Sequence, residues 1–185
     1  WECADMYEMH VDGDLDNTKW VLENGTGNYI IGSFDGKKFT PESSGYQGPW
    51  MRSHWGGSYY ATQTFKNAPN GRRIQLGWMS TGKDALPDAF PGMPFNQQMS
   101  VPRKLTLRKT DQGLRVFRYP VTEIELLYSK EHRYSDKLLK PGGKMLTDID
   151  CNLLDINLEV ELKDAETIEF DLRGEKFLYD VKDRR

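Results

Sequence analysis

The sequence predicts an all-β protein, because short stretches of alternating apolar and polar residues recur along it and turn-forming residues separate them. Residues 72–79 are one example, since apolar side chains alternate there with polar or small ones and Asn70-Gly71 just before them favours a tight turn. Such stretches at intervals of about 8–12 residues are typical of sandwiches, barrels and propellers. The alternation alone does not distinguish among these architectures.

Several strands are expected in the first part of the chain: 19–22, 29–34, 37–40, 58–65, 72–79, 98–108 and 114–118. Asp35-Gly36 is expected to form a hairpin turn. Strict alternation along 58–65 would place Tyr60 and Thr62 on the same face of a strand. After Pro120, the apolar spacing predicts one short helix that connects the two parts of the chain.

The last part of the chain follows a polar stretch, residues 129–144, which ends in Pro141-Gly142-Gly143 and is the expected domain boundary. Beyond it, strict alternation returns in residues 154–163, 168–172 and 177–181. Half-buried antiparallel strands of this kind build sandwiches. The sequence therefore predicts the first strands of a second β domain.

Composition and charge exclude several functions. The net charge of −3 and pI near 5.7 give no basic surface for nucleic acid. No apolar stretch approaches the roughly 20 residues that a membrane-spanning helix needs. The cysteines, Cys3 and Cys151, lie far apart, and the sequence has no metal-ligand spacing and no phosphate loop, so no metal and no cofactor is expected. The aromatic content of 12% fits either filled sheet faces or the lining of a sugar cleft.

The segment Trp1-Glu2-Cys3-Ala4-Asp5-Met6 resembles the Glu-Cys-Pro-Asp-Leu motif of glycoside hydrolase family 32, which includes invertases, levanases and inulinases. The resemblance continues in the family's order over roughly residues 1–128. It is carried by residues 19–22, 29–39, 58–65, 71–79 and 93–107. One of these segments alone would be weak evidence, but the ordered set is specific.

The resemblance implies a five-bladed β-propeller with a central funnel, joined by a linker to a C-terminal β-sandwich. Residues 1–118 would form the later blades, 119–140 the linker, and 141–185 the first strands of the sandwich. The chain opens on Trp-Glu-Cys without a Met and ends just after an expected strand, so we interpret it as an internal fragment.

By resemblance, Glu2 is the general acid/base of a retaining β-fructosidase that cleaves fructosyl bonds in levan, inulin or sucrose. Retaining enzymes pair such a group with a nucleophilic carboxylate about 5–5.5 Å away. The family's nucleophile is an Asp in an Asn-Asp-Pro-Asn-Gly-like motif, and another Asp, in an Arg-Asp-Pro motif, binds substrate hydroxyls. Neither motif occurs in this chain, so the chain alone should not complete the reaction.

Further residues are candidates for substrate binding: Cys3, His54, Trp55, Tyr59 and Trp78. An indole or phenol ring packs well on a sugar face, but the same residues in alternating strands also serve as blade core. Cys3 is expected to be a buried neighbour of Glu2 rather than a nucleophile. The segment 53–57 departs from the family, since many members have Asp where this chain has His54.

The expected partner is a fructose-containing oligo- or polysaccharide, and the resemblance implies an exported protein, extracellular or periplasmic. The departure at His54 leaves open a non-catalytic relative that binds fructans without cleaving them. A further alternative is a remnant that cannot fold alone, because isolated blades expose strand edges.

Overall fold

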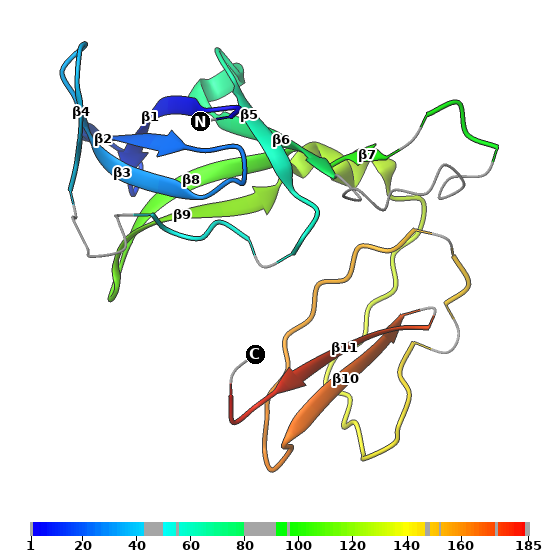
Figure 1. Ribbon diagram of the computed structural model, residues 1–185. Helices are drawn as coiled ribbons and strands as arrows, with labels where there is room; N and C mark the ends of the chain where they lie inside the picture. The colour runs from blue at the N-terminus through cyan, green and yellow to red at the C-terminus, as the bar shows by residue number, and fades with distance from the viewer. Residues whose placement is uncertain are drawn as a thin grey trace. The chain divides into compact units, whose positions relative to one another are not determined.

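The computed structural model describes residues 2–42, 50–54, 56–79, 92–95, 97–146, 149–151, 153–172 and 174–183. Apart from two short 3₁₀ helices, the regular secondary structure of these residues is β-strand, which confirms the predicted all-β class (Figure 1). The chain divides into unit 1, Trp1–Glu131, and unit 2, His132–Arg185. Among the helices of the described residues, none has the length and apolar character needed to cross a membrane.

Unit 1 begins with a four-stranded antiparallel meander, which we call the first blade. Its strands are β1 (Asp5–Val11), β2 (Asp14–Glu23), β3 (Tyr29–Phe34) and β4 (Phe39–Pro41). Asp12 and Gly13 both have positive φ, 53° and 81°, as the tight turn between β1 and β2 requires. The sequence analysis did not predict β1, although Tyr7, Met9 and Val11 alternate there with polar residues.

A second antiparallel set, the second blade, has the strand order β5-β6-β8-β9. These strands are β5 (Tyr60–Phe65), β6 (Arg73–Met79), β8 (Arg103–Thr110) and β9 (Gly113–Pro120), and β7 (Gln98–Met99) pairs with the end of β6. The 3₁₀ helix η1 (Pro69–Gly71) precedes β6. The short helix expected after Pro120 is present as the 3₁₀ helix η2 (Thr122–Leu127).

The two blades meet along β1 and β8, which pair in parallel at Val11 and Leu107. The core of unit 1 lies around this junction, because every second side chain of the joined strands points inward. Its buried residues are Tyr7, Met9, Val11, Val21, Tyr29, Ile31, Leu105, Leu107 and Val116. Both blades contribute to one hydrophobic core, so packing fixes them against each other.

Strand β5 does not alternate as predicted. The register between β5 and β6 shifts between Tyr60 and Gln63, and Ala61 has a left-handed φ of 51°. This β-bulge adds a residue to one strand and reverses the side-chain alternation. As a result Tyr59 and Thr62 are both buried, at 7% and 0% exposure, and the prediction that Tyr60 and Thr62 share a face is wrong.

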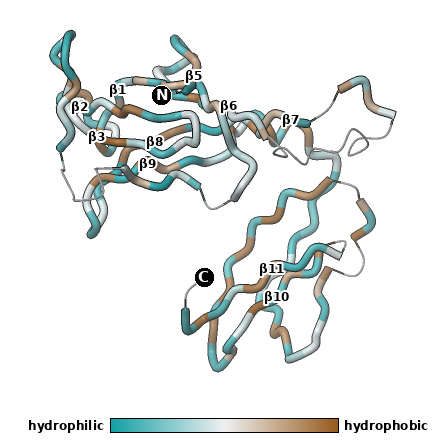
Figure 2. The backbone as a smooth tube through the Cα atoms, viewed as in Figure 1, coloured by the Kyte–Doolittle hydropathy of each residue, from teal (hydrophilic) through white to brown (hydrophobic). Residues whose placement is uncertain are grey.

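Unit 2 contains the hairpin of β10 (Thr167–Leu172) and β11 (Glu175–Asp180), where hydrophobic and hydrophilic residues intermix along the strands (Figure 2). The strand predicted over residues 154–163 does not form, and its apolar residues Leu154 to Leu162 remain partly exposed. A strand needs a hydrogen-bonding neighbour, and no described segment pairs with these residues. The expected linker, 119–140, contains the end of β9, η2 and the division between the units.

Candidate active site

The pocket around Glu2 lies where the start of the first blade meets the start of β5. Glu2 precedes β1, and its Oε2 accepts a hydrogen bond from the Tyr60 hydroxyl. An open pocket of about 330 Å³ is lined by Glu2, Asn24, Gly25, Thr26, Trp50 and Tyr60. The hydrogen bond to Glu2 raises the pKa of Tyr60 above its usual value.

The residues after Glu2 are fixed to β5 by hydrogen bonds. The Cys3 carbonyl accepts from the Gln63 side-chain amide at 3.2 Å, and Asp5 Oδ2 accepts from the Thr64 backbone N–H at 2.7 Å. Cys3 is exposed rather than buried as expected. The Asp5 carboxylate therefore binds the β5 backbone and is not among the described groups that line the pocket.

The turn between β2 and β3 forms one wall of the pocket. Asn24 Oδ1 accepts hydrogen bonds from the Thr26 hydroxyl at 2.7 Å and from the Asn28 backbone N–H at 3.1 Å, which closes the turn on itself. The Gly25 carbonyl accepts from the Ala61 N–H at 2.7 Å and ties the turn to β5. Side chains larger than hydrogen do not fit at position 25, because a Cβ would lie 2.8 Å from the Glu2 carbonyl oxygen.

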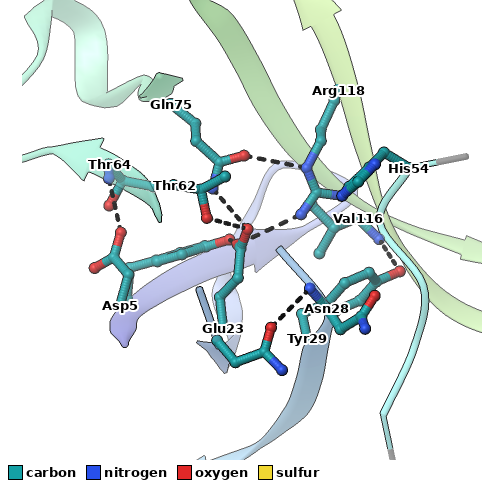
Figure 3. Close-up of polar contacts among 12 residues, drawn as sticks. Asp5, Glu23, Asn28, Tyr29, His54, Thr62, Thr64, Gln75, Val116 and Arg118 are labelled. Atoms are coloured by element: carbon teal, nitrogen blue, oxygen red, sulfur yellow. Dashed lines mark hydrogen bonds and ion pairs between the residues drawn. The ribbon is translucent and has the colours of Figure 1, made fainter. Parts of the chain in front are cut away.

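Behind this wall, the fully buried carboxylate of Glu23 sits among hydrogen-bond donors from both blades (Figure 3). Its oxygens accept from the Tyr7 hydroxyl at 2.7 Å, the Thr62 hydroxyl at 2.9 Å and the Gln75 amide at 2.9 Å, and Arg118 Nη2 lies at 3.4 Å. A buried carboxylate is costly unless it is paired in this way. Burial, followed by the neighbouring Glu23 charge, raises the pKa of Tyr7 well above its usual value.

The network extends from Glu23 to the predicted site residue Tyr59. Gln75 Oε1 accepts from the Tyr59 hydroxyl at 3.1 Å and from Arg118 Nε at 3.2 Å. The Tyr59 ring fills the space that a Cβ at Gly77 would occupy. Tyr59 is therefore placed in the interior, beneath the pocket.

Of the other predicted residues that the structure describes, neither Cys3 nor His54 nor Trp78 is among the side chains that line the pocket. His54 Nε2 lies 2.8 Å from the Thr26 carbonyl oxygen, so the imidazole supports the turn. Trp78, 38% exposed, packs edge-to-face against Tyr60 with ring centroids 6.3 Å apart. Trp55 lies outside the described residues.

The sequence analysis did not select three residues that line the pocket, Asn24, Trp50 and Tyr60. It also did not select the buried Glu23. Alternation places Tyr59 and Tyr60 on opposite faces of the strand but does not say which face meets the pocket, and the bulge after Tyr60 has no sequence signature. Glu23 carried a usable signal, since it is a charged residue directly after the apolar run Trp20-Val21-Leu22. Charged residues are rarely fully buried unless they are paired.

Known proteins resemble this chain over most of its length. Residues 1–120 match the family model described as Glycosyl hydrolases family 32 N-terminal domain. The levanase of Bacillus subtilis (strain 168) is 30% identical over 183 residues, which cover 92% of this chain and 26% of the levanase. The cell wall isozyme of β-fructofuranosidase from Pisum sativum is 28% identical over 189 residues, covering 91% of this chain and 33% of that protein.

Among solved structures, the exo-inulinase from Aspergillus awamori is similar, with a TM-score of 0.53 and 26% identity over 65% of this chain and 26% of the exo-inulinase. An all-β chain with a carboxyl side chain in an open pocket fits a glycoside hydrolase. The chain belongs to glycosyl hydrolases family 32. It spans roughly a quarter to a third of the length of these relatives.

Proposed function

We propose that this chain is part of a retaining β-fructosidase in which Glu2 is the general acid/base. The observation that carries the proposal is the placement of the Glu2 carboxyl, which lines the pocket and accepts a hydrogen bond from the Tyr60 hydroxyl. By resemblance, Glu2 occupies the position of the family's catalytic motif. The nucleophilic carboxylate of such an enzyme would come from polypeptide outside these 185 residues. Unit 1 would then supply one half of the carboxyl pair.

In the first step, the nucleophilic carboxylate attacks the anomeric carbon of the fructosyl group while protonated Glu2 gives its proton to the leaving oxygen. In the second step, the Glu2 carboxylate takes a proton from water, which attacks the same carbon and releases fructose. The Tyr60 hydroxyl donates to the ionised carboxylate between the two steps. This contact would hold the Glu2 carboxylate in place for the second step.

The pocket wall suggests how a sugar would bind. Trp50 offers an indole face for the apolar side of a furanose ring, and the exposed Trp78 lies next to Tyr60. Trp78, His54, Cys3 and Trp55 remain predicted substrate contacts. The burial of Tyr59 favours support of the pocket over direct contact.

The proposed substrates are levan, inulin and sucrose, since levanase, exo-inulinase and β-fructofuranosidase are the names of the similar proteins. One of them is a cell wall isozyme. We propose accordingly that the protein acts outside the cytoplasm on fructose-containing saccharides.

The test is release of fructose from sucrose, inulin and levan by the full polypeptide that contains this chain and by its Glu2→Gln variant. Loss of an acid/base lowers the rate by roughly a hundredfold to ten-thousandfold. Glu8→Gln is the matched control, because Glu8 is an exposed carboxylate of β1 beyond the pocket lining. Equal activity of the Glu2→Gln variant and the wild type would refute the role of Glu2.

A non-catalytic fructan-binding protein is the second candidate, and the placement of His54 favours it. The imidazole is held by the Thr26 carbonyl at the position where many family members have an Asp. No fructose release by the wild type, together with calorimetric binding of inulin or levan, would support this candidate over the enzyme.

A further inference from the structure

The β-bulge in β5 determines which side chain meets Glu2. In a regular strand, Tyr60 and Thr62 would point to the same face. Because Ala61 adopts a left-handed φ of 51°, Thr62 turns into the interior while the Tyr60 hydroxyl reaches the Glu2 carboxyl. Left-handed backbone is unfavourable for a non-glycine residue, so surrounding contacts must hold the bulge in place.

Those contacts converge on Glu23. After the bulge, the Thr62 hydroxyl donates to Glu23 Oε1 at 2.9 Å. Before it, the Tyr59 hydroxyl donates to Gln75, whose amide donates to the same Glu23 oxygen at 2.9 Å. The bulge is therefore anchored on both sides by one buried carboxylate.

The backbone after Glu23 adds a further anchor. Gly25 lies in the turn that directly follows Glu23, and its carbonyl accepts a hydrogen bond from the Ala61 N–H at 2.7 Å. The Glu23 side chain and the turn beside it thus fix successive residues of the bulge. A buried ion pair such as Glu23–Arg118 is often no more stabilising than packed apolar groups, so stability alone does not account for it.

We propose that Glu23 is a positioning residue for Glu2. Glu23 accepts a hydrogen bond from the Thr62 hydroxyl and thereby fixes the bulge at Ala61. The bulge in turn directs the Tyr60 hydroxyl onto the Glu2 carboxyl. The effect on turnover rests on the proposed function, whereas the effect on geometry does not. Glu23 acts through Thr62 and Tyr60 and does not contact the substrate.

The test uses Thr62→Val and Thr62→Ser in the full polypeptide. Valine keeps the shape of threonine without its hydroxyl, so Thr62→Val should lower kcat by up to about tenfold with little change in KM, because its effect cannot exceed the loss of the Tyr60–Glu2 hydrogen bond. Thr62→Ser retains the donor and should restore most of the lost activity. A crystal structure of Thr62→Val should show the Tyr60 hydroxyl displaced from Glu2.

A double-mutant cycle separates positioning from general damage. In a Tyr60→Phe background there is no hydroxyl left to position, so adding Thr62→Val should cause little further loss of kcat. Full additivity of the two substitutions, or an unchanged Tyr60–Glu2 hydrogen bond in the Thr62→Val crystal structure, would overturn the proposal. If the wild type releases no fructose, the proposed function fails, and the crystal structure still decides the positioning.

Discussion

The Tyr60 hydroxyl donates a hydrogen bond to the Glu2 carboxyl across a separation of 58 residues in the chain. Glu2 belongs to the start of the first blade and Tyr60 to the start of the second. The contact therefore depends on how the two blades pack, as well as on the two residues themselves. It is also the most direct target for testing the proposed chemistry.

Replacing Tyr60 with Phe should lower kcat about tenfold while KM changes little, because the ring stays and only the donor to the ionised Glu2 is lost. Initial rates of sucrose and inulin hydrolysis by the full polypeptide measure both constants. Tyr119→Phe is the control, since Tyr119 is an exposed tyrosine of β9. A rise in KM with unchanged kcat would instead make Tyr60 a substrate-binding residue.

Gly25→Ala should damage the pocket. The added Cβ would lie 2.8 Å from the Glu2 carbonyl oxygen and 3.2 Å from the Tyr60 ring, so either the turn or Glu2 must move. We expect kcat to fall about 10- to 100-fold through misplacement. An added Cβ at Gly57 meets no atom of the described residues within 4 Å, so Gly57→Ala should retain wild-type kinetics. Equal kinetics for the two alanine variants would show that the close packing at Gly25 is dispensable.

Glu23→Leu should destabilise the protein by about 3–5 kcal/mol, because it leaves the buried Arg118 guanidinium without its carboxylate. Urea unfolding of the full polypeptide, followed by tryptophan fluorescence, measures the loss. Replacing Glu23 and Arg118 together with leucine should be less damaging than Glu23→Leu alone. A loss below about 1 kcal/mol for the single variant would mean that Arg118 finds other partners.

The ion pair between Arg72 and Glu123 predicts a dependence of stability on pH. The Arg72 hydrogen bond lowers the pKa of Glu123 from 4.5 to about 2 in the folded protein. A lowered pKa stabilises the folded state above the unfolded value, and this contribution is lost as the pH falls from about 4.5 to about 2.

The urea midpoints of the wild type and Glu123→Gln should therefore differ at pH 5.5 and converge toward pH 2.5. Arg72→Gln removes the other partner and should show the same convergence. A gap between wild type and variant that stays constant over this range would contradict the assignment.

The sequence predicted most strands of unit 1, with β1 as an exception. The strand predicted at 29–34 coincides with β3, because its side chains are apolar at both ends and turn residues flank it. The face of Tyr60 was beyond prediction, since alanine rarely adopts positive φ and its bulge is stabilised by Glu23 and Gly25 from another strand and turn. Residues 154–163 show the converse, because alternation selects a face but cannot supply a partner strand.

Within the described residues, the parallel pair of Val11 with Leu107 joins the backbone ladders of the two blades, and the Asp12 N–H reinforces it by donating to the Leu107 carbonyl at 2.9 Å. Glu2 and Tyr60 thus stand on opposite sides of the junction between the two blades. Sliding of one blade against the other would separate them while leaving both side chains chemically intact. Substitutions along the β1–β8 junction could therefore change the distance between Glu2 and Tyr60 without altering either side chain.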